Sequence, residues 1–329
     1  MKNSKMLVMA ALTAIITGST SCNKTEVPSI KEGNPAVLHV NVCSARFTKA
    51  SLSEDNEKKV DDVQILVFRK DGELDAYAKS SATENIKISC TTGAKDIFAL
   101  ANAPDLSSVS KLSEYNDMKS SLSDNSLDHF VMTGKVSMEL GASSSVSIPV
   151  KRIVSRISID KVAANFTSAA YKAKEFKVTG IYVVNVAGDI NYKGDSEPTI
   201  WYNKMKHETS AVDNLLYEKI QDGTVTAAAP YSRTSCFYVY PNGTAEDSQA
   251  EAFSARHTRL VVETTLGGIT YYYPVTIPQI ESNKTYSVKA LTVTRPGSLS
   301  PDIPVSSAEC TFSISVSDWE EGSSEDYTI

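Results

Sequence analysis

The chain has 329 residues, of which 41% are hydrophobic and 22% are charged, so it is long enough for two domains with sizeable cores. Its formal net charge of -6 argues against a nucleic-acid-binding protein, which needs a basic face, and against a polybasic patch for a membrane surface.

The first 22 residues are typical of an export signal. Residues 1–5 are short and positive, and residues 6–16 (MLVMAALTAII) form an apolar run that is too short to cross a bilayer as a helix. Small residues at 18–21 then precede Cys22, which predicts a lipoprotein signal peptide over 1–21 and acylation of the Cys22 thiol. The alternative is an ordinary secretory signal in which Cys22 is incidental, because Ser19 stands where a leucine is usual.

The first half of the remaining chain has the patterns of β-strands. Residues 36–42 (AVLHVNV) alternate, with Ala36, Leu38, Val40 and Val42 on one face. Residues 60–69 are more continuously apolar, which indicates a strand buried on both sides, and Asp71-Gly72 then favours a tight hairpin. Further strands are predicted at 86–91, 96–101, 135–139 and 145–150. Helical spacing predicts one short helix over 110–122, with Ser113 as its cap.

A second series of strands begins at residues 152–162. Gly267-Gly268 reads as a hairpin turn between two of its members, and the polar stretch 187–230 is expected to hold a short helix around 211–220. Further strands are predicted at 175–186, 236–240, 258–265, 270–277, 285–294 and 310–316. Short strands separated by turns predict a mainly β fold of two β-sandwich domains in tandem, with one or two short helices and a boundary near residue 150.

The last predicted strand is amphipathic. Phe312, Ile314 and Val316 share one face, and serines occupy the other. We expect residues 320–329 to form a polar tail. Because the strand lies near the end of the chain, it can be donated to the sheet of another molecule.

Catalytic and metal-binding patterns are missing from the sequence. The four histidines (His39, His129, His207 and His257) have no partner at metal-ligand spacing, and there is no nucleophile elbow or phosphate-binding loop. We therefore predict a protein that is not an enzyme and that has no metal or other cofactor. The four remaining cysteines are widely spaced, which favours small buried side chains over a zinc site; they are Cys43, Cys90, Cys236 and Cys310. The sequence allows disulfides among them but does not assign any pairing.

Motifs spread over nearly the whole chain resemble the fimbrillin family, the FimA-type subunits of type V pili of Gram-negative anaerobes. They are IFALAN (97–102), FVMTG (130–134), RIVSRISI (152–159), FYVYPN (237–242), YYYPV (271–275), NKTY (283–286), RPG (295–297) and FSISVSDW (312–319), together with the start at Cys22. Their order and spacing carry the resemblance.

The resemblance implies a fold of two transthyretin-like β-sandwiches and a maturation pathway. A lipidated (palmitate-bearing) precursor would reach the outer membrane, and an Arg-specific protease would cleave between Arg46 and Phe47. Lys49 would suit a protease that accepts either base. The implied parts are a lipidated propeptide (22–46), an N-terminal domain (47–150) and a C-terminal domain (151–329).

The implied assembly is an exchange of strands between copies of the chain. Cleavage would remove the strand that carries Leu38, Val40 and Val42, and the open groove would receive Phe312, Ile314 and Val316 of a neighbour. The partners would be further copies of the chain and accessory fimbrial subunits, in an extracellular fimbria.

Other roles remain open at this point. An anchor subunit would keep its lipid and first strand, and a tip or accessory subunit belongs to the same family. A surface glycan-binding lipoprotein would use exposed aromatic side chains, for which Trp201, Trp319 and residues 271–273 are the candidates. A hydrolase would need two carboxylates that converge in a cleft.

Overall fold

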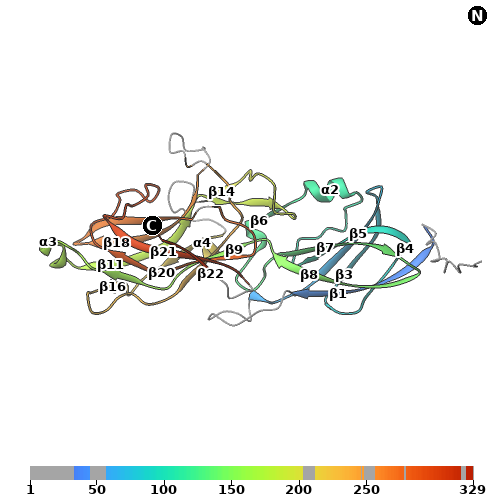
Figure 1. The fold of residues 1–329 in the computed structure, drawn as a ribbon, viewed down its shortest axis with the longest axis horizontal. Coiled ribbons are helices and arrows are strands. Elements are labelled where there is room, and N and C mark those ends of the chain that lie inside the picture. Colours follow the sequence, from blue (N-terminus) through green and yellow to red (C-terminus); the bar gives the residue numbers. More distant parts are fainter. Residues whose placement is uncertain are drawn as a thin grey trace, which may run out of the picture.

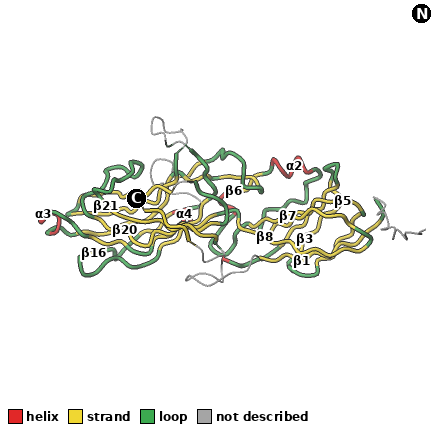
Figure 2. Tube along the Cα trace, viewed as in Figure 1, coloured by secondary structure: helices red, strands yellow, loops and turns green. Residues whose placement is uncertain are grey.

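The computed structural model describes residues 33–44, 57–202, 212–245, 247, 256–277, 279–319 and 324–328. These residues form an elongated molecule in which two bodies built from strands lie end to end (Figure 1). Strands dominate both bodies, and helices are short (Figure 2). In the described part of the chain, no helix has the length and apolar character needed to cross a membrane.

The N-terminal body is built on one seven-stranded sheet in the order β3-β2-β5-β7-β8-β1-β4. Its strands are β1 (Pro35–Ser44), β2 (Val63–Arg69), β3 (Leu74–Ser80), β4 (Ile86–Thr91), β5 (Gly93–Ala101), β7 (Met132–Leu140) and β8 (Ser143–Arg152). The apolar run predicted to be buried on both sides is β2, whose first six residues are all buried. The predicted Asp71-Gly72 turn joins β2 to β3, with Gly72 at φ 85°.

The seven-stranded sheet folds over on itself where β7 meets β8. These strands pair only at Met132↔Arg152 and Thr133↔Lys151. A Cβ atom at Gly134 would lie 2.2 Å from the carbonyl oxygen of Pro149, so only glycine allows the two strands to approach so closely there. The two halves of the sheet enclose a core to which β1, β2, β4, β5, β7 and β8 all contribute.

The C-terminal body contains two main sheets. One has the order β17-β9-β20-β21-β22, with β10 beside β20, and the other has the order β15-β11-β18-β19, with β16 beside β11. The strands are β9 (Ser155–Ile159), β10 (Val162–Ala164), β11 (Phe176–Val184), β15 (Tyr217–Lys219), β16 (Thr224–Val225), β17 (Ser235–Val239), β18 (Thr258–Leu266), β19 (Ile269–Ile277), β20 (Lys284–Val293), β21 (Cys310–Asp318) and β22 (Ser324–Thr328). The predicted Gly267-Gly268 turn joins β18 to β19.

Smaller elements connect the two bodies. β6 (Lys119–Ser121) pairs with β13 (Asp189–Asn191), and one continuous apolar core contains residues of both bodies. The remaining elements are β12 (Val186–Ala187), β14 (Trp201–Tyr202), α2 (Leu112–Asp117), η1 (Leu122–Asp124), α3 (Ala169–Lys172) and α4 (Asp213–Leu216). The predicted mainly β fold of tandem sandwiches is therefore confirmed, with three short α-helices among the described residues. The division into domains at residue 150 stays a proposal, supported by main sheets that end and begin near Arg152 and Ser155.

Two local predictions were wrong in detail, and one strand was not predicted. The helix expected over 110–122 is only α2, because its last residues pair with β13 instead. Its N-cap is Lys111 rather than Ser113, and the Glu114 carboxylate accepts hydrogen bonds from the amides of Ser110 and Lys111. The tail that was predicted to be polar contains a strand that was not predicted, β22, which pairs with β21.

Candidate functional site

The strand predicted to be removable is β1, and it lies inside a sheet rather than at its edge. It runs antiparallel to β4 over six residue pairs, from Pro35↔Thr91 to Val40↔Ile86. It runs parallel to β8 over eight, from Val37↔Ser143 to Ser44↔Val150. We call this position between β4 and β8 the β1 slot.

One face of β1 fills the core of the N-terminal body. Leu38 and Val40 are 0% exposed, and Ala36 and Val42 are 5% and 6% exposed. Burial of each large side chain contributes roughly 1.5–3 kcal/mol. The opposite face, with His39, Asn41 and Cys43, is half-buried or exposed. The strand is thus held by one apolar row and two ladders of backbone hydrogen bonds.

Both walls of the β1 slot, β4 and β8, have most of their strand pairing with β1. Among the described strands, β4 pairs with β1 alone, and β8 pairs with β7 only at the two residue pairs given above. Loss of β1 would leave residues 86–91 and 143–150 without that neighbour. Unpaired backbone groups beside an exposed apolar core are a template for another strand.

A buried charge holds the end of β4 to the rest of the sandwich. The carboxylate of Asp75 on β3 accepts hydrogen bonds from the amide and hydroxyl of Thr91, both 2.8 Å, and lies 3.1 Å from the Lys95 ammonium. The side chains of Asp75 and Lys95 are each 3% exposed. Burial raises the pKa of Asp75, but the bonds from Thr91 and Lys95 outweigh burial and leave that pKa below its ordinary value of 3.8. This contact does not involve β1, so it supports β4 independently.

The predicted donor strand is β21, which lies between β20 and β22 in the C-terminal body. Ile314 is 4% exposed, whereas Phe312 and Val316 are half-buried and pack against the main core. In this state the strand is therefore part of its own sheet. Donation to a neighbour stays a prediction, and it requires β21 to leave β20.

The predicted processing residues lie outside the described residues. These are Cys22, Arg46 and Phe47, together with Lys49. Arg46 follows the last residue of β1, Ser44, by two positions, and Glu57 is the next described residue after it. Cleavage at Arg46 would therefore separate β1 from the remainder of the chain.

The cysteines and aromatic side chains support no alternative site. Cys43, Cys90, Cys236 and Cys310 are all free thiols, with Cys43 exposed and Cys90 and Cys310 buried. Burial raises the pKa of the Cys310 thiol to about 12. The described residues contain no group of three or more His, Cys, Asp or Glu side chains that would hold a metal ion.

The aromatic residues considered for glycan binding are largely covered. Trp319 and Tyr273 are buried, and Trp201, Tyr271 and Tyr272 are half-buried. Tyr271, Tyr272 and Tyr273 alternate along β19, as its pairing with β18 requires. These side chains serve the core and the sheet rather than an open stacking platform.

Comparison with protein families gives a match over just under half of the chain, in the part that contains the β1 slot. The family model described as major fimbrial subunit protein (FimA) matches residues 19–173, which include Cys22, β1, β4 and β8. This match and the solved structures described next support a fimbrillin-family protein. A comparison with curated proteins found no match.

Solved structures share the fold of this chain over nearly its whole described length. A fimbrilin (FimA) of Porphyromonas gingivalis is 15% identical, with a TM-score of 0.62 over 88% of this chain and 98% of that chain. The tip fimbrial protein Mfa3 of the same organism is 15% identical, with a TM-score of 0.56 over 87% and 100%. A candidate cell adhesion protein of Bacteroides eggerthii is 18% identical, with a TM-score of 0.68 over 87% and 97%. At these identities the likeness is one of fold.

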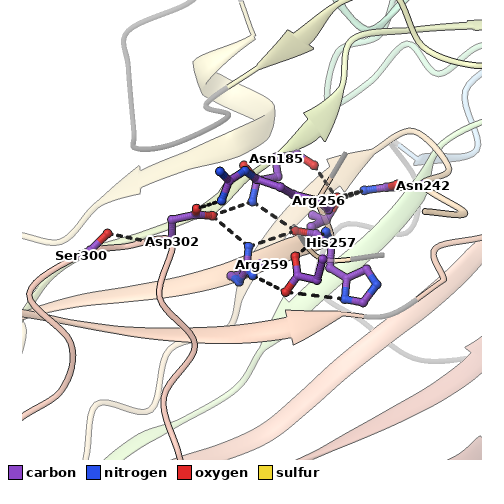
Figure 3. A network of polar contacts seen from close by, with 9 residues as sticks. Asn185, Asn242, Arg256, His257, Arg259, Ser300 and Asp302 are labelled. Carbon is purple, nitrogen blue, oxygen red and sulfur yellow. Dashed lines mark hydrogen bonds and ion pairs between the residues drawn. The ribbon is translucent and has the colours of Figure 1, made fainter. Parts of the chain in front are cut away.

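Sequence reasoning missed two charged clusters of this chain. One surrounds Glu57, and the other surrounds Asp302. Their members are far apart in sequence and follow no spacing rule, so only the fold brings them together. The Glu57 carboxylate contacts Trp319, which directly follows β21, and Asp302 ties the loop between β20 and β21 to Arg259 of β18 (Figure 3).

Proposed function

We propose that this fimbrillin-family protein is a structural subunit of a cell-surface fimbria with a role in adhesion. It is exported as a precursor that is acylated at Cys22 and carried to the outer membrane. An Arg-specific protease cleaves after Arg46, so that the mature chain begins at Phe47 and joins an extracellular filament. The family match, which includes Cys22 and the β1 slot, supports the structural part of this proposal.

The position of β1 is the observation that carries the proposal. Three large inward side chains of β1 are almost fully buried, and both neighbours of the strand depend on it. With β1 in place the slot is filled, and the precursor has no open edge there. With β1 removed, the same surface would bind a strand of similar pattern by β-augmentation.

The apolar row of β21 has the pattern that the β1 slot requires. Four alternating positions, Cys310, Phe312, Ile314 and Val316, correspond in spacing to Ala36, Leu38, Val40 and Val42. β22 has no such row, since its sequence is Ser-Glu-Asp-Tyr-Thr. We therefore assign β21, rather than β22, as the donor. Donation from one copy to the next is a head-to-tail contact that need not close, so it builds a filament.

The partners follow from this scheme. They are further copies of the chain, accessory fimbrial subunits and the maturation protease, with the outer membrane as a lipid-mediated partner before cleavage. An anchor subunit would differ in one respect, because it would retain residues 22–46 and the lipid.

N-terminal sequencing and intact mass of protein sheared from the cell surface test the proposal. A chain that begins at Phe47, recovered in large assemblies that resist mild denaturation, is the expected result. A chain that begins at an acylated Cys22 and stays monomeric with the membrane would contradict the filament role and favour an anchor or a glycan-binding lipoprotein.

A further inference from the structure

The sequence contains eight arginines, and the proposed maturation step uses only one of them. Hydrolysis there adds one water across the peptide bond between Arg46 and Phe47, which leaves a carboxylate on Arg46 and an amine on Phe47. A further cut by the same Arg-specific protease would divide the mature chain. The other seven arginines all lie among the described residues, so the surroundings of each one can be compared.

An endoprotease must reach both the side chain and the backbone of the residue after which it cuts. The arginine side chain has to enter a specificity pocket, and the backbone on both sides of the bond has to give up its own hydrogen bonds. Exposed loop tips meet these requirements, whereas buried side chains and paired strands meet them only after local unfolding. Cleavage then follows the small population of the opened state, so it is slow. Burial and backbone pairing therefore decide which arginine is cut.

Two of the seven arginines are buried around Glu57. Arg152 is 1% exposed and Arg156 is 9% exposed. The Glu57 carboxylate accepts hydrogen bonds from Arg156 Nη1 (3.0 and 3.2 Å), and the Glu57 carbonyl oxygen accepts them from Arg152 Nε (3.0 Å) and Nη2 (2.6 Å). The guanidinium carbons of Arg152 and Arg156 also lie 4.6 and 5.2 Å from the centre of the Trp319 ring. Neither side chain can enter a protease pocket while these contacts persist.

Two more arginines are buried around Asp302 (Figure 3). The side chains of Arg256 and Arg259 are 1% and 0% exposed. The Asp302 carboxylate accepts hydrogen bonds from Arg256 and from Arg259 Nη1 (2.9 Å), and Asp247 pairs with Arg259 Nη2. The backbone of Arg259 belongs to β18, which lies between β11 and β19. Four of the seven arginines are thus enclosed, although arginine side chains in proteins are mostly exposed.

Arg69 and Arg233 have exposed side chains but lie where the backbone is paired. Their side chains are 43% and 74% exposed. Arg69 is the last residue of β2, which pairs with β5 up to this position, and its amide donates to the Glu73 carbonyl oxygen (2.9 Å). On one side of Arg233, Tyr231 exchanges two backbone hydrogen bonds with Val162 (2.8 and 2.9 Å); on the other side, β17 begins two residues later. Cleavage at either arginine therefore requires these pairs to open.

Arg295 is protected by the residue that follows it. Its side chain is exposed, but its peptide bond leads to Pro296. The proline nitrogen carries no N–H group and its ring constrains the backbone, so this bond is a poor protease substrate. The backbone of Arg295 is also held, because its amide donates to the Glu309 carbonyl oxygen (3.2 Å) and its own carbonyl oxygen accepts from the Tyr273 hydroxyl (2.8 Å).

We propose that the fold withholds these seven arginines from the Arg-specific protease, so that Arg46 is the one left for processing. Burial withholds four of them, backbone pairing withholds Arg69 and Arg233, and the following proline withholds Arg295. This inference rests on the proposed function, because it takes that protease as the partner of the precursor. The selectivity of maturation then comes from where the arginines lie in the folded protein, in addition to any preference of the protease for the sequence around Arg46.

Limited proteolysis of the purified full-length chain with an Arg-specific endoprotease tests the inference, with products measured as intact masses after denaturation. The wild-type chain should be cut after Arg46 and should leave a persistent product of residues 47–329. The test variant is Ala227→Arg, which places an arginine in the exposed turn 226–229, six residues before Arg233 and beyond the end of β16. Cleavage after position 227 should be at least about tenfold faster than cleavage after any of the seven native arginines. Ala227→Lys is the matched control, which adds the same charge and should not be cut there.

Two results would overturn the inference. Cleavage of the native wild-type chain after any of the seven arginines, as fast as after Arg46, would show that the fold does not withhold them. An uncut Ala227→Arg variant would show that resistance does not depend on where an arginine lies. Failure of the proposed function gives a different result: a wild-type chain that is not cut at Arg46, beside a variant that is cut after position 227, would count against the proposed processing while it supported the withholding of the seven.

Discussion

Leu38→Ala in the precursor is the perturbation that isolates the role of β1. Leu38 is 0% exposed among apolar residues of β2, β4, β5, β7 and β8, so truncation leaves a cavity and should lower the free energy of unfolding by about 2–5 kcal/mol. His39→Ala on the outward, half-buried face of the same strand should change it by only about 0.5 kcal/mol or less. Urea unfolding followed by circular dichroism measures both values. Exchange at the β4 and β8 amides assigns the transition to the N-terminal body.

Cleavage at Arg46 provides a second test of the role of Leu38, because it separates β1 from the rest of the chain. After cleavage and gel filtration, the Leu38→Ala and wild-type proteins have the same sequence from Phe47 onward, so their unfolding curves should coincide. A difference that persists in the cleaved proteins would mean that β1 stays in its slot, and strand exchange at that slot would be refuted. Equal stability of the two precursors would show that β1 does not contribute to the core as its burial implies.

Three further predictions concern processing, the junction and acid. Arg46→Gln should leave residues 22–46 on the chain and keep it monomeric, whereas Lys49→Gln should be processed normally. Intact mass separates the two outcomes. Equal processing of both variants would rule out Arg46 as the cleavage site. Ile314→Ala should weaken the contact between neighbouring subunits by about 2–5 kcal/mol and lower the temperature at which filaments dissociate into monomers. Ser313→Ala should change neither quantity. Filaments that are equally stable in both variants would exclude Ile314 from the contact between subunits. The lowered pKa of Asp75 means that its contribution to stability is present above about pH 4 and is lost as the pH falls through the folded pKa. Asp75→Asn should therefore cost about 3–5 kcal/mol at pH 7, because buried Lys95 loses its charged partner and keeps the Thr91 hydroxyl as an uncharged one. The variant should also reduce the loss of stability between pH 6 and pH 3 in urea unfolding, and an unchanged pH dependence would contradict the assigned role.

Local patterns were sufficient to predict most strands. The alternation at Ala36, Leu38, Val40 and Val42 identified β1 and its inward face, and the continuous run in β2 correctly predicted burial on both sides. Both signals exist because side chains alternate along a strand and because a strand covered on both faces tolerates few polar residues. The turns at Asp71-Gly72 and Gly267-Gly268 were also predictable, since glycine at positive φ is a local requirement.

Predictions failed where distant pairing decided the structure. The helix expected over 110–122 stops after Asp117, because Lys119–Ser121 form a ladder with β13, some seventy residues later in the chain. β22 lacked an apolar row, and its strand conformation comes from pairing with β21. Helical or polar spacing carries no information about such partners.

The charged clusters show the same limit for the candidate site. Glu57 and Trp319 are separated by 262 positions, and Asp302 lies 43 positions from Arg259. Arg152 and Arg156 read as polar members of a strand in the sequence, whereas in the fold both face the Trp319 ring. The apolar rows of β1 and β21 were visible in the sequence, but the contacts that hold β21 required the tertiary structure.

An electron cryo-microscopy structure of the assembled filament tests the central claim most directly. We predict that the strand between β4 and β8 of each subunit belongs to its neighbour and carries Phe312, Ile314 and Val316 toward the core. A filament in which each subunit retains its own residues 35–44 in that slot, or in which another segment fills it, would contradict the account.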